Sequence, residues 1–563
     1  MILQPISNLV AICAKKGIQN AILSPGSRCA PLTLAFSRHP DIHARTISDE
    51  RSAGFIALGM AQQLEKPVVL VCTSGSAALN YYPAVAEAFF QQIPLLVLTA
   101  DRPPEWVDQW DGQTIFQPEV YGKHVKKSFQ FPDSFEKEEQ VWHANRIVSE
   151  AILLSKQFPP GPVHINIPLR EPFYPEVGEE LVFPENPKVV TLSPGNPVLG
   201  EDSLKNMKDR LQTVKKILIV AGQQKPDPKI QSILDQLAKE QKVVIITDAI
   251  SNLQSDQTIC LHDHWLGNEQ FHSELAPELI ISFGKSVISK SLKLFLRKTE
   301  ASHWHIQSDG QAKDTFQRLT RILACTPLSF LDWLSQNLPT LDGEYLLQWN
   351  SLEKTAQQAL PLVFEKLEFG EYPALNLLLK KIPPFSKIHV ANSMAVRYLN
   401  LLGKRNQEII CNRGTSGIDG SNSTAVGCVF TTKEPVTLIT GDMAFFYDRN
   451  AFWHNYSMAN LRIIVLNNHA GGIFRLIDGP ANQPELEEFF ETKQNLNASH
   501  LADEFGFTYS LVKTLEELKS ALSNFYTPGI QPKIMEIESV SANNVAILKQ
   551  VKAFVSNELT QSN

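Results

Sequence analysis

Short apolar runs alternate with amphipathic stretches through the first third of the chain. The runs are "NAIL" (20–23), "PVVLVC" (67–72), "PLLVLTA" (94–100) and "PVHINIP" (162–168). Runs of this length, bounded by turn residues, predict buried strands. Because the stretches between them have the periodicity of helices, we expect a parallel sheet that is covered on both faces.

The same alternation occurs twice more. A second set of apolar runs lies at 215–224, 242–249 and 279–284, and a third at 387–393, 435–442 and 462–468. The Pro-rich, acidic stretch 168–197 has no periodicity and is typical of an inter-domain linker. We therefore predict an α/β protein of three doubly wound, mainly parallel-sheet domains, at 1–180, 195–345 and 346–563.

The composition of the chain indicates which kinds of partner and which cellular compartment to expect. The 563 residues carry a net charge of −7, with a pI near 6.1, which argues against nucleic acid or an anionic membrane as the main partner. Seven dispersed cysteines without a C-x-x-C pair are typical of a reducing compartment and offer no zinc site. No apolar run approaches the ~18 residues of a membrane span, and the amino terminus lacks the pattern of a signal peptide. We expect a cytoplasmic protein without membrane insertion.

The stretch "ISDERSAGFIALGMA" (47–61) has two adjacent acids at the start of a predicted helix, where one acid is enough to cap it. Its apolar positions 53, 56, 57 and 60 define one face of a buried helix, and Asp49 and Glu50 stand at the start. Acids at helix starts commonly cap free backbone N–H groups. Asp49 alone can fill that role, so Glu50 is left for another one.

Two strands predicted in the third domain end in residues that bind hard metal ions. Asp442 ends "VTLITGD", Asn467 and Asn468 end "IIVLNN", and 26 residues separate Asp442 from Asn468. This spacing accommodates a crossover helix, and ligands of open α/β sheets bind outside the carboxyl ends of the strands. Carboxylate and amide oxygens suit Mg²⁺, and a helix beginning near Met443 would direct N–H groups to a phosphate. The alternative is that both dipeptides are only turn residues.

This pattern resembles the diphosphate-binding half of thiamine diphosphate enzymes, although Met443 replaces the second glycine of their Gly-Asp-Gly motif. The resemblance implies Mg²⁺, or Mn²⁺, bound by Asp442, Asn468 and the backbone of Ala470. It also implies a buried Glu50 that hydrogen-bonds N1′ of the cofactor aminopyrimidine across a subunit interface, and hence a homodimer or a dimer of dimers. The other cofactor-binding residues that it implies are Ile418 beneath the cofactor, Gly441, Met443, Ala444, and Phe474 over the cleft.

A more specific resemblance covers nearly the whole chain, to the 2-succinyl-5-enolpyruvyl-6-hydroxy-3-cyclohexene-1-carboxylate synthase family of menaquinone biosynthesis. The matching stretches are "SPGSRCAPLTLAF" (24–36), "SDERSAGFIALGMA" (48–61), "TSGSAALNYYPAVAEA" (73–88), "LTADRPPEW" (98–106), "NRGTSGIDGSNSTAVG" (412–427), "GDMAFFYDRNA" (441–451) and "NNHAGGIF" (467–474). The implied reaction is a transferase reaction that decarboxylates 2-oxoglutarate and adds the succinyl unit 1,4 to isochorismate.

Both substrates carry two carboxylates, which the planar fork of arginine binds well. For substrate binding the resemblance implies Ser27, Arg28, Arg102, Gln113 and Lys290, with Gln113 beside the isochorismate site and Ser291 in place of a family arginine that follows the lysine. On the succinyl side it implies Ser393, Arg397 and Arg413. Arg28, Arg102, Gln113 and Arg413 are expected, with Glu50, to act in catalysis. We interpret His469 as a packing or solvent-facing residue.

Two alternatives stay open from the sequence. One is a different thiamine diphosphate-dependent 2-oxo-acid decarboxylase or carboligase, which would not need isochorismate. The other is a non-catalytic, regulatory protein that kept the fold, although such a protein would not need Glu50, Asp442 and Asn468 together. A lone arginine is ordinarily a solvated surface residue, and Gln113 could simply bind backbone groups.

Overall fold

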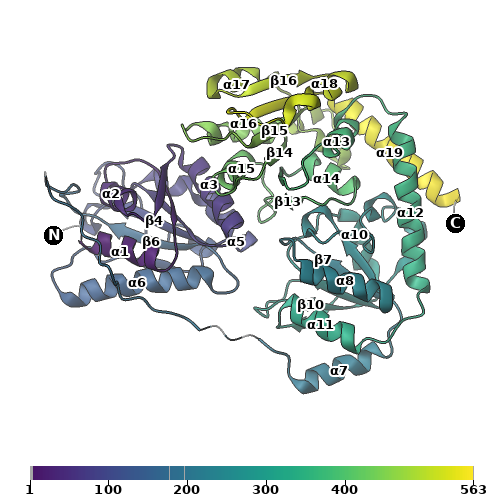
Figure 1. Ribbon diagram of the computed structural model, residues 1–563, viewed down its shortest axis with the longest axis horizontal. Coiled ribbons are helices and arrows are strands. Elements are labelled where there is room, and N and C mark those ends of the chain that lie inside the picture. Colours follow the sequence, from purple (N-terminus) through teal and green to yellow (C-terminus); the bar gives the residue numbers. More distant parts are fainter. Residues whose placement is uncertain (1–3, 177, 194, 196, 562–563) are drawn as a thin grey trace.

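Three parallel sheets form the framework of the chain (Figure 1). A computed structural model describes residues 4–176, 178–193, 195 and 197–561. The first sheet has the order β2 (His43–Thr46), β1 (Asn20–Leu23), β3 (Val68–Cys72), β4 (Leu95–Asp101), β6 (Val163–Pro168), β5 (Ser128–Gln130). The second has the order β11 (Leu319–Leu323), β10 (Ser302–Ile306), β9 (Leu279–Phe283), β7 (Ile217–Ala221), β8 (Val244–Thr247). The third has the order β13 (Glu408–Ile410), β12 (Lys387–Val390), β14 (Val436–Gly441), β15 (Leu461–Asn467), β17 (Lys533–Glu538), β16 (Thr508–Val512).

Helices connect and cover these strands. In the amino-terminal unit they are α1 (Gln4–Lys15), α2 (Ala30–Arg38), α3 (Glu50–Leu64), α4 (Ser76–Asn80), α5 (Tyr82–Gln91) and α6 (Glu138–Lys156). The middle unit contains α7 (Glu201–Leu211), α8 (Pro228–Glu240), α9 (His272–Leu275), α10 (Lys290–Lys298) and α11 (Pro327–Asn337). Then follow α12 (Glu344–Phe364), α13 (Glu371–Leu379), α14 (Met394–Leu401), α15 (Ser421–Val429), α16 (Asp442–Tyr447), α17 (Ser499–Phe505), α18 (Leu515–Phe525) and α19 (Ser541–Gln561).

The predicted fold class is confirmed. All ten apolar runs form strands, and every pairing between strands is parallel. In each sheet the strand order reverses beside an early strand, between β1 and β3, β7 and β9, and β12 and β14. These are the positions at which open α/β sheets bind ligands.

The Pro-rich stretch between the first two units contains no regular element in its described part. After β6 ends at Pro168, the described residues before α7 form neither helix nor strand. Figure 1 shows this segment running from the amino-terminal unit to α7 at the far end of the middle unit. No helix of the described residues is long and apolar enough to cross a membrane.

The amino-terminal and carboxy-terminal units pack together through α3 and α15, which lie side by side in Figure 1. Glycines allow the close approach of the two helices. A Cβ at Gly59 would lie 2.1 Å from the Thr424 carbonyl oxygen, and a Cβ at Gly427 would lie 2.1 Å from that of Ile56. The helix that begins at Glu50 is thus fixed against the helix that follows Ile418.

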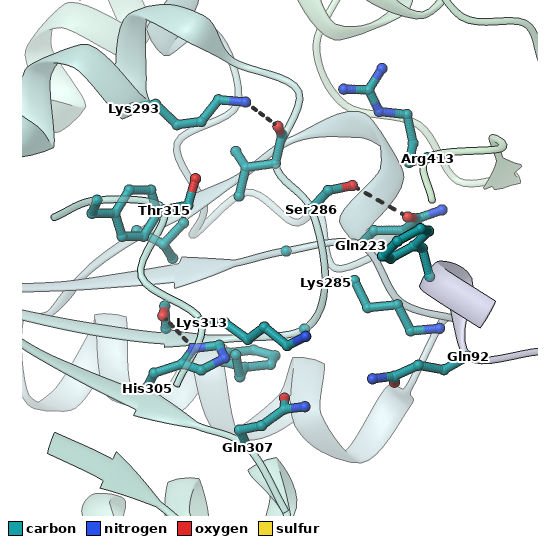
Figure 2. A pocket seen from close by; sticks show the side chains of 18 of the residues that line it. Gln92, Gln223, Lys285, Ser286, Lys293, His305, Gln307, Lys313, Thr315 and Arg413 are labelled. Carbon is teal, nitrogen blue, oxygen red and sulfur yellow. Dashed lines mark hydrogen bonds between the residues drawn. The ribbon is translucent and has the colours of Figure 1, made fainter. Parts of the chain in front are cut away.

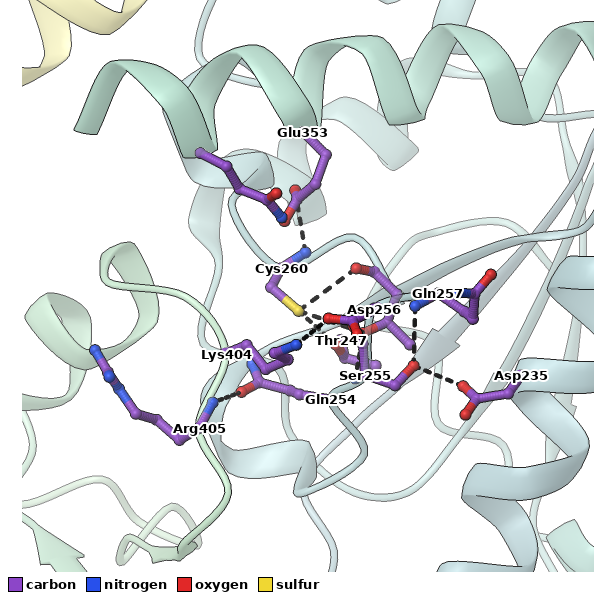
Figure 3. A network of polar contacts seen from close by, with 12 residues as sticks. Asp235, Thr247, Gln254, Ser255, Asp256, Gln257, Cys260, Glu353, Lys404 and Arg405 are labelled. Carbon is purple, nitrogen blue, oxygen red and sulfur yellow. Dashed lines mark hydrogen bonds and ion pairs between the residues drawn. The ribbon is translucent and has the colours of Figure 1, made fainter. Parts of the chain in front are cut away.

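Polar contacts fix the middle unit against the carboxy-terminal unit (Figure 3). The Lys404 ammonium contacts the Asp256 carboxylate, and the Arg405 backbone N–H donates to Gln254 Oε1 at 3.0 Å. From α12, the buried Glu353 carboxylate accepts the backbone N–H groups of Cys260 at 3.2 Å and Leu261 at 3.0 Å. These contacts join residues 254–261 of the middle unit to the segment after α14 and to α12.

Candidate active site

Asp442 lies at the carboxyl end of β14, where it begins α16 as the sequence predicts. Its side chain is only 2% exposed, and one carboxylate oxygen accepts the Gln494 Nε2 amide at 2.8 Å. Burial raises the pKa of Asp442 to about 6. No lysine or arginine forms an ion pair with this carboxylate in the part of the chain that the structure describes.

Asn468 follows β15, the strand next to β14, and its amide is held on both sides. The Nδ2 group donates to Glu371 Oε1 at 2.6 Å, and Oδ1 accepts the Ala470 backbone N–H at 3.1 Å. These two bonds fix which end of the amide is oxygen. Glu371, at the start of α13, is 1% exposed, and burial raises its pKa to about 7, with Asp442 adding a smaller repulsive contribution.

Sequence reasoning missed Glu371. It stands 97 residues before Asn468 and is one acid at a helix start, a pattern that ordinarily indicates only a cap. The Glu371 carboxylate does not cap its own helix. It instead accepts a hydrogen bond from the side chain that the sequence assigns to the metal.

The neighbouring Asn467 has a different environment. Its Nδ2 group donates to Glu536 Oε1 at 2.6 Å and to the Leu496 carbonyl at 2.9 Å, while Oδ1 accepts the His469 backbone N–H at 3.0 Å. Asn467 therefore joins the end of β15 to β17 and to the segment around Leu496, which precedes α17. Asn467 Oδ1 also accepts the Gln494 amide that Asp442 accepts, whereas Asn468 is the asparagine bonded to Glu371.

The residues around Asp442 fit a hard divalent cation. Asp442 offers carboxylate oxygens, Asn468 offers an amide oxygen, and the backbone of Ala470 lies beside both. Oxygen donors of this kind suit Mg²⁺, which keeps phosphate and water as its remaining ligands. A cation there would also offset the burial of a carboxylate that has no cationic partner.

Glu50 begins α3 in a less enclosed setting than the buried one expected for it. Asp49 is the cap, as predicted, because its side chain accepts the Ser52 N–H at 3.0 Å. Asp49 also accepts Asn450 Nδ2 at 2.7 Å, and Arg51 donates to the Tyr447 carbonyl at 2.8 Å. Glu50 itself is half-buried and forms no hydrogen bond or ion pair with any described residue.

The other predicted residues of the amino-terminal unit lie around the ends of its strands. Arg28 is buried, donates to the Leu169 carbonyl at 2.8 Å and lies 4.5 Å from the centroid of the Phe173 ring. Arg102 donates to the Gly112 carbonyl at 2.9 Å. Ser27 and Gln113 are exposed.

The predicted residues of the other two units separate into two cavities. Lys290 and Arg397 line a cavity of about 420 Å³, in which Arg397 donates to the Ser393 carbonyl at 2.6 Å. Arg413 donates to Asn392 Oδ1 at 2.9 Å and lines a second cavity, of about 330 Å³. In Figure 2 Arg413 of the carboxy-terminal unit lies close to Gln223 and across from Lys293, both of the middle unit.

Two apolar residues flank the metal-ligand cluster in sequence. Ile418, between β13 and α15, is 38% exposed although it is apolar. Phe474 lies in the short 3-10 helix Gly472–Leu476, with its ring 5.9 Å from that of Phe490. Gly441, Met443 and Ala444 form the turn from β14 into α16.

Comparison with known families places the chain in a class. Residues 7–125 match the model of the thiamine pyrophosphate enzyme N-terminal TPP binding domain. Residues 201–387 match the middle domain of thiamine pyrophosphate enzymes, and residues 391–537 match their C-terminal TPP binding domain. The chain is a thiamine pyrophosphate (thiamine diphosphate) enzyme by fold and by sequence, as the strand-end motif predicts.

Similar curated proteins narrow the class. A 2-succinyl-5-enolpyruvyl-6-hydroxy-3-cyclohexene-1-carboxylate synthase of Cytophaga hutchinsonii is 45% identical, over 98% of this chain and 98% of the relative. Proteins of the same name from Christiangramia forsetii and Porphyromonas gingivalis are each 37% identical, over 97% and 98% of this chain and 98% and 97% of the relative. The chain belongs to this synthase family.

Proposed function

We propose that the protein catalyses thiamine diphosphate-dependent decarboxylation of 2-oxoglutarate and 1,4-addition of the succinyl unit to isochorismate. The product would be 2-succinyl-5-enolpyruvyl-6-hydroxy-3-cyclohexene-1-carboxylate, in menaquinone biosynthesis. The observation that carries this proposal is the 45% identity, over 98% of the chain, to a relative that bears the name of this synthase. Asp442 and Asn468 at adjacent strand ends, with Glu371 bonded to Asn468, support it.

In this proposal the carboxy-terminal unit holds the diphosphate end of the cofactor. Asp442, Asn468 and the Ala470 backbone would bind Mg²⁺, or Mn²⁺, and the backbone of Gly441, Met443 and Ala444 would hold the diphosphate. Thiamine diphosphate, when bound, supplies an electron sink for decarboxylation. Ile418 supports the cofactor from below, and Phe474 shields it from water.

Glu50 of the amino-terminal unit holds a proton at N1′ of the aminopyrimidine. A carboxyl group in this role needs an enclosed setting, where its pKa rises toward the working pH. Since Glu50 is half-buried and unpartnered among the described residues, a second subunit would complete its setting. We therefore propose a homodimer or a dimer of dimers, which light scattering at assay concentration tests; an active monomer would contradict it.

Arginine and lysine side chains bind the substrate carboxylates in the proposed site. Ser27, Arg28, Arg102, Gln113 and Lys290 are assigned to substrate binding, with Gln113 beside isochorismate, and Ser393, Arg397 and Arg413 are assigned to the succinyl carboxylate. The separation of Arg397 and Arg413 into neighbouring cavities is compatible with a site at the junction of three units.

The domain limits 1–180, 195–345 and 346–563 remain a prediction. A cytoplasmic location is proposed from the seven free cysteines.

Product analysis by mass spectrometry tests the function. Purified protein is mixed with thiamine diphosphate, Mg²⁺ and 2-oxoglutarate, with and without isochorismate. We expect the succinyl-cyclohexene adduct only when both substrates are present. Carbon dioxide without an adduct would indicate a different carboligase, and neither signal from folded, cofactor-bound protein would favour a non-catalytic role.

A further inference from the structure

The cavity of about 420 Å³ between the middle and carboxy-terminal units has a cationic residue that the sequence did not single out. Lys290 at the start of α10 and Arg397 of α14 line one part of it, and Lys552 of the carboxy-terminal helix α19 lines it as well. Ser291, next to Lys290, also lines the cavity and carries no charge. Three helices from distant parts of the chain thus bring three cations to one cavity.

The cations of this cavity, Lys290, Arg397 and Lys552, outnumber its two acids. Asp263 keeps its negative charge, because it accepts only the neutral Asn400 Nδ2 group at 2.8 Å and the Ser289 hydroxyl, and this charge acts on Arg397. Asp478 is the other acid in the lining. Neither Lys290 nor Lys552 forms a hydrogen bond or ion pair with any residue in the described ranges. The cavity therefore offers unpaired ammonium groups to an anion.

The backbone of α19 fixes where Lys552 stands. The preceding Val551 is fully buried, and Leu548, one turn earlier on the same face, lines the cavity together with Lys552. At the start of the helix, the Ser541 hydroxyl donates to the buried Glu491 carboxylate at 2.5 Å. Lys552 is thus held at the cavity by the packing of its own helix.

The same cavity adjoins the segment proposed to shield the cofactor. Ile473 and Leu476, from the short helix that contains Phe474, form part of its wall. An anion bound here would lie beside Arg397 on one side and this segment on the other. Both proposed substrates carry carboxylates that need cations, and a lysine binds a carboxylate as a point charge.

We propose that Lys552 is a substrate-binding residue that holds a carboxylate in this cavity, together with Lys290 and Arg397. The proposal rests on the proposed function for the identity of the two dicarboxylates. It makes the carboxy-terminal helix part of the substrate site and supplies the second cation that Ser291 cannot.

Steady-state kinetics of Lys552→Gln test the proposal, with Lys549→Gln as the matched control. Lys549 is exposed on the same helix and does not line the cavity. We expect the KM of one substrate to rise about 10- to 100-fold in Lys552→Gln, the range of a hydrogen bond to a charged group, with kcat much less affected. A raised KM for 2-oxoglutarate assigns Lys552 to the donor, and a raised KM for isochorismate assigns it to the acceptor. Lys552→Arg should restore most of the affinity.

Binding measurements separate this proposal from the proposed function. Calorimetric titration of the cofactor- and Mg²⁺-loaded protein with succinate, and separately with chorismate, reports dicarboxylate affinity without turnover. Weaker binding of either probe to Lys552→Gln than to Lys549→Gln supports the proposal, even if the wild-type protein yields no adduct. Unchanged KM values and unchanged affinities for both probes would overturn it.

Discussion

The two halves of the proposed cofactor site differ in how completely one chain builds them. At the ends of β14 and β15 each polar side chain is hydrogen-bonded: Asp442 to half-buried Gln494, Asn468 to buried Glu371, and Asn467 to buried Glu536. At the start of α3, Glu50 has no partner among the described residues, although its neighbours Asp49 and Arg51 are both engaged. The metal half is therefore organised before anything binds, and the glutamate half is not.

This difference has a physical basis. Metal ligands must be held in a fixed geometry, so they need neighbours that orient them. A proton-relay carboxyl needs an enclosed surface around it and freedom from competing hydrogen bonds, because a fixed partner would stabilise one protonation state. Burial raises the pKa of Glu371 to about 7 and that of Asp442 to about 6. Glu50, in contrast, is only half-buried in this chain.

Substitution of Glu50 should have the largest effect. Glu50→Gln removes the proton relay but keeps the size of the side chain, so we expect turnover to fall by about 10²–10⁴-fold with cofactor affinity largely intact. Turnover is measured by product formation, and cofactor affinity by equilibrium titration. Glu65→Gln, at the opposite end of the same helix, is the control and should be nearly neutral. Near-normal turnover in Glu50→Gln would remove Glu50 from this role.

Substitution of Glu371 tests the metal-binding half of the proposed site, and we expect a smaller effect than for Glu50. Glu371→Met removes the acceptor of Asn468 Nδ2 and frees the amide to rotate, so we expect metal affinity to fall by about 10- to 100-fold. Titration of Mg²⁺-dependent thiamine diphosphate binding measures this change directly.

Glu371→Gln is the informative companion, because its amide oxygen still accepts the Asn468 hydrogen bond. It should retain most of the metal affinity that Glu371→Met loses. Equal metal affinity in the wild-type protein and a folded Glu371→Met variant would show that Asn468 is oriented by other contacts.

Sequence patterns predict the centre of each sheet better than its edges. The ten predicted strands each contain apolar residues next to turn residues, although β6 also holds buried His164 and Asn166. The missed strands include the exposed edge strand β2, β10 with buried His303 and His305, and β17 with buried Glu536. A buried polar residue makes a strand hard to predict, because the hydrogen-bond partner that allows its burial comes from elsewhere in the fold and is not visible in the sequence. His303, for example, shares the Ser282 hydroxyl with His305.

Sequence predicts the candidate site in the same uneven way. The sequence predicts Asp442 and Asn468 because both follow apolar strands and are separated by the length of a crossover connection. The sequence does not predict Glu371, Gln494 and Lys552, because each reaches the site from a helix or an irregular segment far away in the sequence. The separation of Arg397 from Arg413 likewise depends on how the middle unit packs against the carboxy-terminal one.

The contact between α3 and α15 links the two halves within one chain, and Gly59 tests it. Gly59→Ala would place a Cβ 2.1 Å from the Thr424 carbonyl oxygen, a backbone atom that cannot rotate away, so the helices must separate. We expect a loss of about 1–3 kcal/mol in stability, as for other overpacked sites, seen as a lower midpoint of denaturant unfolding. Gly200→Ala, where nothing lies within 4 Å of the added Cβ, should not lower the midpoint. If Gly59→Ala unfolds at the same midpoint as Gly200→Ala, the close approach of α3 and α15 does not fix Glu50 against the carboxy-terminal unit.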